Sequence, residues 1–392
     1  MESPEHQNRD EASPAPELTA AGTGDRIPPD AEYWLALSRL PGVGRVTFLK
    51  LIQAYRSPKA AWERTDTEWR EAGVSRGPIE THAFRSEALA WAKHQVDTLA
   101  KSAWSLVVFG DSRFPPSLTT LRYAPPFFFL RGELPDAPAI AVVGARQATE
   151  YGIRAAQMIV GDLARAGVAI VSGFARGIDT VAHSEALSAG GITVAVWGSG
   201  PDVVYPPENK KLVEPIVERG AILTEFPFGV PPDRHNFPVR NRLIAGLAAG
   251  VLVVQARRQS GALLTAQHAL EQGKDVYAIP SEIGREQFGG TLELLKQGAR
   301  IVTSADDILG TLGIASAPPL TASARDEQRP LPLLTDIERR VYDGLGGTPC
   351  HIDRLAVSLR LSVGECARVL TTLELKGLIK KSAGNLISHA PR

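Results

Sequence analysis

The chain has 392 residues, with 43 Lys or Arg balanced by 43 Asp or Glu, so its formal net charge is +0. This length favours two or three domains, and a hydrophobic fraction of 44% is ordinary for a protein with a real core. The balanced charge excludes a strong overall field that attracts nucleic acid. Any site for a polyanion must therefore come from local clustering of basic side chains.

Cysteine content and apolar runs narrow the class of protein further. The two cysteines, Cys350 and Cys366, form no CxxC pair, which argues against a zinc site and a disulfide framework and fits a reducing cytoplasm. The longest apolar run, residues 243–256, is shorter than the about 20 residues that a membrane-spanning helix needs. The polar N-terminus has no signal-peptide core. We therefore expect a cytoplasmic protein.

The N-terminal third begins with a tail and continues into helices. Residues 1–28 are rich in Pro, Glu, Ala and Gly, so we expect them to be disordered. From residue 29 to 103, apolar residues beginning with Tyr33 and Trp34 follow helical spacing, which predicts a SAM-like or helix-hairpin-helix-like domain. The turn at residues 40–44 (Leu-Pro-Gly-Val-Gly) can direct backbone N–H groups at a phosphate, or it can be an ordinary tight turn that uses glycine at positive φ.

Residues 104–314 alternate between short hydrophobic runs and helical segments, which predicts an α/β domain with an extended Rossmann-like parallel sheet. Five of the runs end in small or basic residues; they begin at Ala139, Val168, Val194, Ala221 and Val251. Two further strands are expected at residues 127–130 and 276–279. In such sheets ligands bind outside the carboxyl ends of the strands, so this domain is expected to be a binding platform.

The C-terminal part contains a linker and a small domain. Residues 315–332 are rich in Pro, Ala and Ser and are typical of a linker. Residues 333–392 predict three helices and two short strands, the topology of a winged helix, with Ser362 and Glu365 as a capping box for the third helix. That helix exposes two acids and two bases, which makes it a poor major-groove reader, so we expect protein docking or weak DNA binding.

The turn after the first of the five strands is a candidate phosphate site. Gly144-Ala145-Arg146 lacks the second and third glycines of a dinucleotide fingerprint, and the chain has no P-loop, so we expect no nucleotide cofactor. We also expect no metal, because no metal-ligand cluster is present in the sequence. An Arg beside backbone N–H groups at a helix start suits a phosphate, although Arg146 can instead form a surface salt bridge. Two other strand ends can expose N–H groups to an anion, Ser172-Gly173 and Ser260-Gly261.

A basic segment with aromatic residues follows the fourth of these strands. Between residues 226 and 261 there are five arginines against one acid, Asp233. Cations that track phosphates and a ring that stacks on a base suit single-stranded nucleic acid. The candidates are Arg234, Phe237, Arg240, Asn241 and Arg242. Alternatively, Arg240 to Arg242 cap and pair within the domain, and Phe237 belongs to the core.

Asp179 and His183, four residues apart, are the nearest approach to an acid–base pair. Such a pair at a helix start can equally be structural. The chain has no G-x-S-x-G elbow and no paired carboxylates of the kind that hydrolases use, so we do not expect an enzyme.

Several segments together resemble the DNA-processing protein A (DprA/Smf) family. They are VVGARQATEYG, SGFARGIDTVAHSEAL, GSGPDVVYPPEN, FPVRNRLIAGLAAGVLVVQA and SGALLTAQHALEQG. The resemblance covers at least residues 109–312. It implies a non-enzymatic protein that binds and protects incoming single-stranded DNA in natural transformation and loads a RecA-type recombinase. It also implies a homodimer through the Rossmann-like domain, with a single-strand-binding protein as a further partner.

The same resemblance implies roles for individual residues. The phosphate-binding turn is Gly144 to Arg146, where the family usually has Ser or Thr at the position of Ala145. Arg234 matches a basic residue of the family, and Phe237 matches an aromatic residue that lines a base pocket. Lys210, in the YPPENK stretch, lies at a further matching position.

Two other functions remain open from the sequence. One is a nucleoside-monophosphate-processing enzyme of a related Rossmann-like fold, for which Glu225 at a strand end is the obvious carboxylate. The other is a winged-helix transcription regulator with a ligand-sensing sheet.

Overall fold

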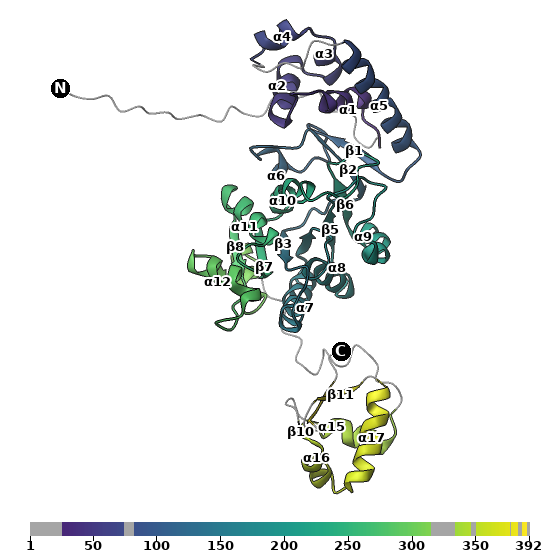
Figure 1. The fold of residues 1–392 in the computed structure, drawn as a ribbon, viewed down its shortest axis with the longest axis vertical. Coiled ribbons are helices and arrows are strands. Elements are labelled where there is room, and N and C mark those ends of the chain that lie inside the picture. Colours follow the sequence, from purple (N-terminus) through teal and green to yellow (C-terminus); the bar gives the residue numbers. More distant parts are fainter. Residues whose placement is uncertain are drawn as a thin grey trace, which may run out of the picture. The chain divides into compact units, whose positions relative to one another are not determined.

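The computed structural model describes residues 26–73, 82–314, 334–345, 350–376, 378–382 and 386–389. The chain divides into two compact units, residues 1–317 and 318–392, which are taken separately (Figure 1). Of the tail expected to be disordered, residues 1–28, the part up to residue 25 lies outside the described residues, as does the expected linker at 315–332. Residues 26–28 are described: the Leu106 N–H donates to the Arg26 carbonyl at 2.9 Å, and Ile27 packs against a buried cluster.

The first unit begins with five helices. They are α1 (Ala31–Arg39), α2 (Arg45–Tyr55), α3 (Pro58–Trp62), α4 (Asp66–Glu71) and α5 (His82–Ala100). The turn between α1 and α2 contains Gly42 at φ 81°, so glycine supplies the left-handed conformation that the tight turn needs. Trp34 of α1 stacks on Phe48 of α2 with ring centroids 5.5 Å apart. The helical hairpin expected at this place is therefore present.

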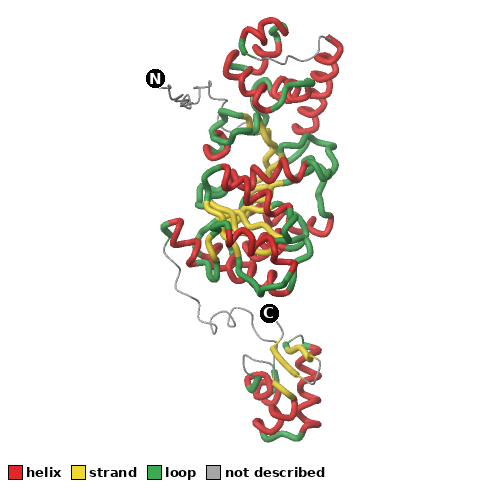
Figure 2. Tube along the Cα trace, turned by 60° about the vertical axis from the view of Figure 1, so that its left-hand side comes forward, coloured by secondary structure: helices red, strands yellow, loops and turns green. Residues whose placement is uncertain are grey.

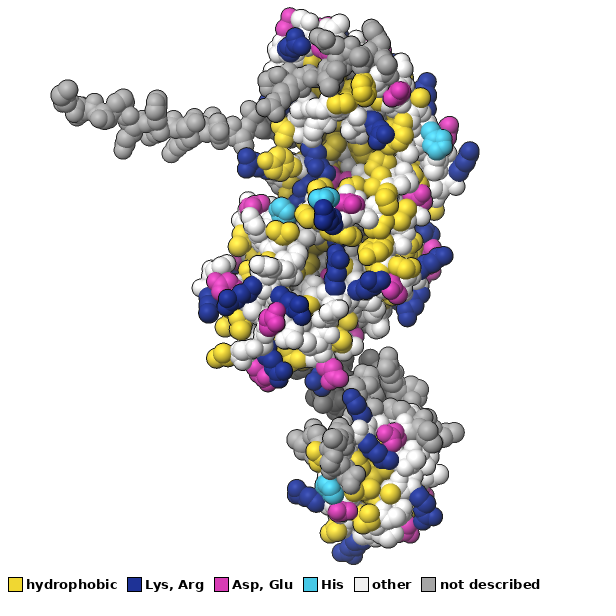
Figure 3. Space-filling model, in the orientation of Figure 1, with side chains coloured by type: hydrophobic (Ala, Val, Ile, Leu, Met, Phe, Trp, Pro, Cys, Tyr) yellow, Lys and Arg dark blue, Asp and Glu magenta, His cyan; other side chains and the backbone are white. Residues whose placement is uncertain are grey.

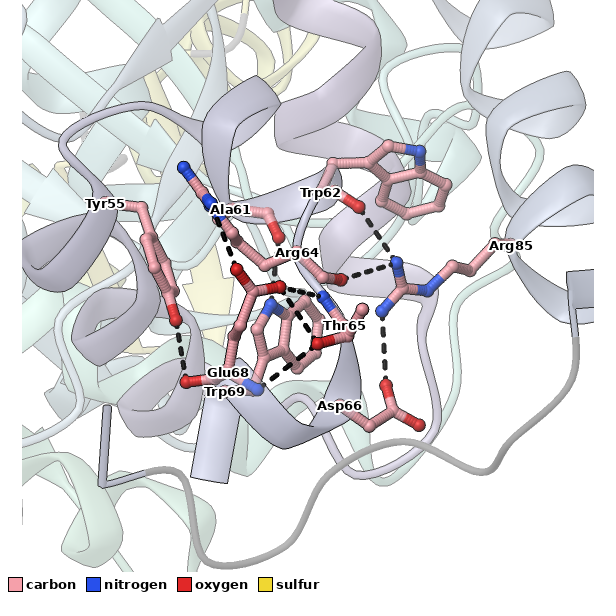
Figure 4. Close-up of polar contacts among 9 residues, drawn as sticks. All are labelled: Tyr55, Ala61, Trp62, Arg64, Thr65, Asp66, Glu68, Trp69 and Arg85. Carbon is pink, nitrogen blue, oxygen red and sulfur yellow. Dashed lines mark hydrogen bonds and ion pairs between the residues drawn. The ribbon is translucent and has the colours of Figure 1, made fainter. Parts of the chain in front are cut away.

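A polar network fixes the short helices α3 and α4 against α5 (Figure 4). Arg85 of α5 donates to the carbonyl oxygens of Trp62 and Arg64, each at 2.9 Å, and pairs with Asp66 at 3.2 Å. The indole N–H of Trp69 donates to the Ala61 carbonyl at 2.9 Å. These bonds satisfy backbone groups that a short helix leaves unpaired at its ends.

The rest of the first unit is built on one sheet in the order β1-β2-β6-β5-β4-β3-β7-β8-β9. The strands are β1 (Ser105–Val108), β2 (Phe127–Gly132), β3 (Ala139–Gly144), β4 (Ala169–Ser172), β5 (Thr193–Val196), β6 (Ala221–Thr224), β7 (Gly250–Gln255), β8 (Asp275–Ala278) and β9 (Arg300–Ile301). β1 pairs antiparallel with β2, and β2 pairs antiparallel with β6. The remaining strands, β6-β5-β4-β3-β7-β8-β9 in sheet order, all run parallel to one another.

Helices cover both faces of this sheet, as Figure 2 shows. The helices are α6 (Pro116–Thr119), α7 (Glu150–Arg165), α8 (Ile178–Ser188), α9 (Val213–Arg219), α10 (Asn236–Leu247), α11 (Gly261–Glu271), α12 (Gly289–Lys296) and α13 (Asp306–Leu312). Alternate residues of β3 enter different cores: Ala141 and Val143 pack with α10 and α11, whereas Ile140 and Val142 pack with α7 and α8. A strand buried on both faces must be hydrophobic throughout, which explains the unbroken apolar runs.

The strand order reverses direction next to β3. From β3 the chain builds β4, β5 and β6 outward on one side, and then returns to place β7, β8 and β9 on the other side. The loops that leave β3 and β7 therefore diverge to opposite faces and open a crevice between them. This reversal is the topological switch point at which doubly wound sheets bind ligands.

The N-terminal helices and the sheet share a hydrophobic core. Phe48 of α2 lies against Phe127 of β2 with centroids 6.5 Å apart, and Trp104 lies against Trp197 at 5.6 Å. One cluster of buried residues includes Trp34, Phe48, Phe127 and Trp197. The helices are thus packed on the sheet rather than joined to it by a tether.

The described residues of the second unit form three helices and a three-stranded antiparallel sheet in the order β10-β12-β11. Its elements are α15 (Asp336–Asp343), β10 (Cys350–His351), α16 (Ile352–Leu359), α17 (Val363–Leu375), β11 (Ile379–Ser382) and β12 (Leu386–His389). The predicted capping box is present: Ser362 and Glu365 each accept from the other's backbone N–H, at 3.2 and 3.0 Å. The two-residue strand β10 was not expected from the sequence.

The predicted α/β architecture is confirmed, and three element boundaries differ. The sequence predicts helices at residues 209–219, 240–249 and 264–271. α10 instead begins at Asn236, and α11 begins at Gly261 because Ser260 caps it by accepting from the Ala262 N–H at 3.3 Å. The segment at Pro207–Leu212 is a 3-10 turn that precedes α9. Among the described residues, no helix is both long and apolar enough to cross a membrane.

Candidate functional site

A pocket of about 550 Å³ opens at the switch point. The turn after β3, the end of β7, the loop after β4 and the first turns of α10 and α11 form its walls. Eight residues predicted from the sequence line it: Gly144, Ala145, Arg146, Phe237, Arg240, Asn241, Ser260 and Gly261. A second hollow of about 430 Å³ shares Arg146 and Phe237 with this pocket and adds Arg234.

Close backbone contacts hold the turn after β3 in place. The N–H of Ile178, at the start of α8, donates to the Ala145 carbonyl at 3.2 Å. Gly177 allows this approach, because it has φ 76° and a Cβ atom there would lie 2.2 Å from the Ala145 oxygen. A Cβ on Gly144 would lie 2.6 Å from the Ile178 side chain. The turn is therefore rigid, and Arg146 projects from it as an exposed side chain.

Phe237 lies in the pocket wall and not in the core. Its half-buried ring packs against the end of β5, where a Cβ on Gly198 would lie 2.9 Å from the ring. The guanidinium of Arg146 lies over the ring, 4.9 Å from its centroid, and that of Arg240 lies 5.8 Å from it. Cations at these distances are attracted to the ring by its quadrupole. An aromatic ring and an exposed cation thus lie together at the mouth of the pocket.

Arg240 is a buried cation in the pocket wall. Its Nη1 donates to the Gly173 carbonyl at 2.5 Å and to the Val196 carbonyl, and its Nε donates to Asn241 Oδ1 at 3.1 Å. Burial lowers the pKa of Arg240 to about 10, so it stays charged at neutral pH. Asn241 in turn donates to the Gly261 carbonyl at 3.2 Å and so joins α10 to α11. Arg240 and Asn241 therefore line the pocket and also hold its walls together.

Arg242 lies outside the pocket, in a buried ion pair. It bonds Glu225, which also accepts from Arg45 of α2 at 3.0 Å. Burial lowers the pKa of Arg242 to about 10, although the negative charge of Glu225 works in the opposite direction. For Arg242, the structure thus shows the alternative in which this residue pairs within the domain. Glu225 is held by two arginines and does not line the pocket, so it is not placed as a catalytic carboxylate.

Three more of the predicted residues lie apart from the main pocket. The Ser172 hydroxyl is buried and donates to the Val142 carbonyl at 2.7 Å, so it cannot meet a ligand. Gly173 lines a small side hollow with Arg146 and Phe237. Lys210 is exposed on the 3-10 turn and lines none of these hollows.

The loop after β4 is already occupied by a carboxylate. Asp179 Oδ2 accepts from the Ala175 N–H at 3.2 Å, across a turn in which Phe174 has φ 61°, and it lies so close to Gly173 that a Cβ atom there would be 2.7 Å away. Burial nevertheless raises the pKa of Asp179 to about 6, against the opposing effect of Arg240. The anion site expected at Ser172-Gly173 is therefore filled from within the protein.

His183 is not part of an acid–base pair with Asp179. Its Nδ1 shares a hydrogen bond of 2.7 Å with the Thr193 hydroxyl, which donates to the Ile170 carbonyl. Burial, with a smaller effect of Arg240, lowers the pKa of His183 to about 3, so the ring is neutral. His183 is therefore structural, and its spacing from Asp179 does not make an acid–base pair, which was one of the two interpretations of that spacing.

Two arginines that were not predicted as site residues, Arg176 and Arg257, also line the pocket. Arg176 follows β4 as Arg146 follows β3, and this parallel was the available signal; it pairs with Glu208 at 2.8 Å. Arg257 follows β7, and no ion pair is recorded for it or for Arg146 within the described part of the chain. On the face drawn in Figure 3, Lys and Arg side chains gather in a line down the middle of the first unit.

Metal ligands are not grouped in the described ranges: no cluster of three or more His, Cys, Asp or Glu side chains there could hold a metal ion. Asp179 is the single carboxylate among the described residues that line the switch-point pocket. The site thus offers arginines, backbone N–H groups and an aromatic ring, which are groups that bind an anion with a planar base.

Comparison with known proteins identifies the family. The family model described as DNA recombination-mediator protein A matches residues 105–313, more than half of the chain. The chain belongs to this family. A second model, the DprA winged helix domain, matches residues 323–385 and confirms the winged helix expected from the sequence.

Relatives across the family support the assignment. The chain is 32% identical to Protein Smf of Synechocystis, over 90% of this chain and 97% of that protein. It is 42% identical to the DNA processing protein DprA of Streptococcus pneumoniae, over 51% of this chain and 71% of that protein. The solved structure of that protein superposes with a TM-score of 0.61 and covers 71% of this chain and 95% of the other. The resemblance read from the motifs is therefore confirmed.

Proposed function

We propose that the switch-point pocket binds single-stranded DNA and that the protein acts as a recombination mediator. The observation that carries the proposal is the arrangement of Arg146 over Phe237, at the mouth of a pocket whose other exposed charges are arginines. A cation for the phosphate and a ring for the base stand side by side, as single-stranded DNA requires. The family description, a mediator of DNA recombination, supports the same function.

We propose a separate task for each part of the site. The rigid turn from Gly144 to Arg146 offers backbone N–H groups and one guanidinium to a phosphate. Phe237 offers its face to a base, with Arg234 in the adjoining hollow to meet the next phosphate. Only an unpaired base can reach the ring, because bases in a duplex are stacked and paired. We therefore expect a preference for single strands over duplex DNA.

We propose a binding protein rather than an enzyme. Glu225, the carboxylate that a nucleoside-monophosphate-processing enzyme would need, is enclosed by Arg45 and Arg242. Asp179 is bound to the backbone N–H of Ala175, and the Ser172 hydroxyl is turned into the sheet. These observations support a site that holds nucleic acid without breaking a bond in it.

The partners follow from the same function and are part of the proposal. A mediator of recombination hands single-stranded DNA to a RecA-type recombinase and competes with, or displaces, a single-strand-binding protein. We further propose that the protein acts as a homodimer through the sheet domain, in the cytoplasm, and protects incoming strands during natural transformation where its host takes up DNA.

Titration of the full chain with labelled oligo(dT), a matched duplex and AMP, at two salt concentrations, tests the proposal. We expect binding to oligo(dT) alone, with log affinity falling by about 0.7 per unit of log salt for each phosphate contact. Arg146→Ala should weaken binding on any sequence and reduce that slope by about 0.7. Arg165→Ala is the matched control, because Arg165 is on α7 and pairs with Asp162 at 2.6 Å, outside the pocket lining. Normal binding by Arg146→Ala, or turnover of AMP, would contradict the proposal.

A further inference from the structure

A single carboxyl group lies in the wall of a pocket that otherwise presents positive charge. Asp179 is 7% exposed, and the other described charged residues of the lining are arginines. A carboxylate beside a bound phosphate repels it. An anion site therefore gains affinity if this carboxyl loses its charge when the anion arrives.

Asp179 serves as the nearby negative charge for the buried Arg240. The two side chains approach the same side of Gly173: a Cβ atom on that glycine would lie 2.7 Å from Asp179 Oδ2 and 2.8 Å from Arg240 Cζ. Arg240 donates hydrogen bonds to two backbone carbonyl oxygens and to the amide oxygen of Asn241, all of which are neutral. A buried cation needs a compensating charge, and in the protein without DNA the carboxylate of Asp179 supplies it.

The groups that face Asp179 come from three elements. Arg240 approaches from α10, Arg146 approaches from the turn after β3, and both stabilise the ionised carboxylate. On the helix that carries Asp179, the buried ring of His183 is neutral, since its pKa lies at about 3. Burial outweighs these charges and raises the pKa of Asp179 to about 6. A small further rise in this pKa would therefore make the Asp179 carboxyl neutral near physiological pH.

We propose that Asp179 is a positioning residue that gives up its negative charge near Arg240 when a DNA phosphate enters the pocket, by taking up one proton from solvent as the strand binds. No covalent bond in the DNA changes: the carboxylate and a proton give the neutral carboxylic acid, and the phosphate becomes the compensating charge. The inference rests on the proposed function, because it requires a phosphate in the switch-point pocket.

The sign of the pH dependence follows from this exchange. A phosphodiester stays ionised throughout the working range, and a second negative charge raises the pKa of the carboxyl above its value in the free protein. Affinity for DNA then increases as pH falls through the interval between the two values. If the pKa in the complex is about one unit higher, affinity rises about fivefold from pH 8 to pH 6. One proton can contribute about tenfold per pH unit at most.

Affinity for oligo(dT), measured on the full chain at constant ionic strength and at pH 8, 7 and 6, tests this inference. We expect the wild-type protein to bind about fivefold more tightly at pH 6, and Asp179→Asn to lose this dependence because the amide carries no proton to exchange. His235→Gln is the matched control, since His235 is exposed and bonds to Arg234 rather than to a group around Asp179. Its pH dependence should stay close to that of the wild type.

Calorimetry on the wild-type chain gives a second measurement that needs no variant. Titration with oligo(dT) in two buffers of different ionisation enthalpy reports the number of protons taken up. An uptake between zero and one, largest near the middle of the interval, supports the inference even if Asp179→Asn does not fold. Equal heats in both buffers, or the same pH dependence in Asp179→Asn as in the wild type, overturn it. Salt-sensitive binding without pH dependence refutes this inference alone, whereas no binding of oligo(dT) at any pH refutes the proposed function.

Discussion

The ion pair between Glu225 and Arg242 yields the sharpest prediction about stability. The side chains of Glu225 and Arg242 are 6% and 9% exposed, whereas Arg45, the other partner of Glu225, is 33% exposed. Glu225→Gln keeps the shape of the side chain but leaves Arg242 as a buried charge without its partner. Removing one member of a buried pair costs about 3–5 kcal/mol. Arg45→Ala removes a partly exposed contact and should cost only about 0.5–1 kcal/mol.

Urea denaturation, followed by far-ultraviolet circular dichroism, measures both changes. Glu225→Gln should lower the unfolding midpoint far more than Arg45→Ala does. The double change Glu225→Gln with Arg242→Met should recover most of the loss, because neither charge then has to be buried. Oligo(dT) binding by the folded fraction should be unaffected, since neither residue lines the pocket. If Glu225→Gln and Arg45→Ala cost the same, Glu225 does not neutralise a buried cation and the reasoning fails.

Two further predictions concern the ring and the buried histidine. Phe237→Leu should weaken oligo(dT) binding by about 1–3 kcal/mol, the contribution of one stacked base, whereas Phe237→Tyr should keep most of the affinity. Fluorescence titration measures both variants. If Phe237→Leu binds as tightly as the wild type, the ring does not contact the DNA. Burial lowers the pKa of His183 to about 3 from its usual 6.5, so its stability contribution is complete above about pH 6.5 and is lost as pH falls toward 3. Urea denaturation of the wild type and of His183→Gln at several pH values measures this effect. Well below pH 6.5, the difference between their free energies of unfolding should shrink by about 1.4 kcal/mol for each pH unit. A difference that stays constant with pH would mean that the ring is not held neutral.

Local pattern was sufficient for most of the sheet, because strands buried on both faces must be apolar throughout. The runs at β3 and β7 were predicted for that reason, and the small residues after them indicated where a ligand could approach. β1 was missed, since Ser105–Val108 follows a long helix without a turn signal that separates it. The starts of α10 and α11 were placed three or four residues too late. Pro238 lies in the first turn of α10 and Gly261 in the first turn of α11, and both residue types are more typical of turns and loops than of helices.

The candidate site was harder to predict, because side chains of the same type have opposite surroundings. Arg146 follows the end of β3 and Arg242 lies within α10, yet Arg146 is exposed over a ring and Arg242 is buried against Glu225. The difference depends on β6 and α2 meeting near residue 225, a contact between segments 180 positions apart in the chain. No local pattern carries that information. Arg176 was missed for the converse reason, since it stands at a strand end but without neighbouring basic residues.

The turns after β3 and β4 show how one type of strand end can serve two purposes. Both have small residues followed by Arg, and both lead into helices of the same face. After β4, the N–H groups are taken by Asp179, which comes from the first turn of the helix that follows. After β3, Thr149 caps the next helix, α7, and the backbone N–H of Thr149 donates to the side-chain oxygen of Gln255. Among the described residues, no carboxylate therefore fills this turn. The filled turn fixes Arg240 beneath Phe237, and the open turn is left for a phosphate. A carboxylate placed after β3 in the same way, for example by Gln147→Asp, would therefore compete with DNA for the open turn.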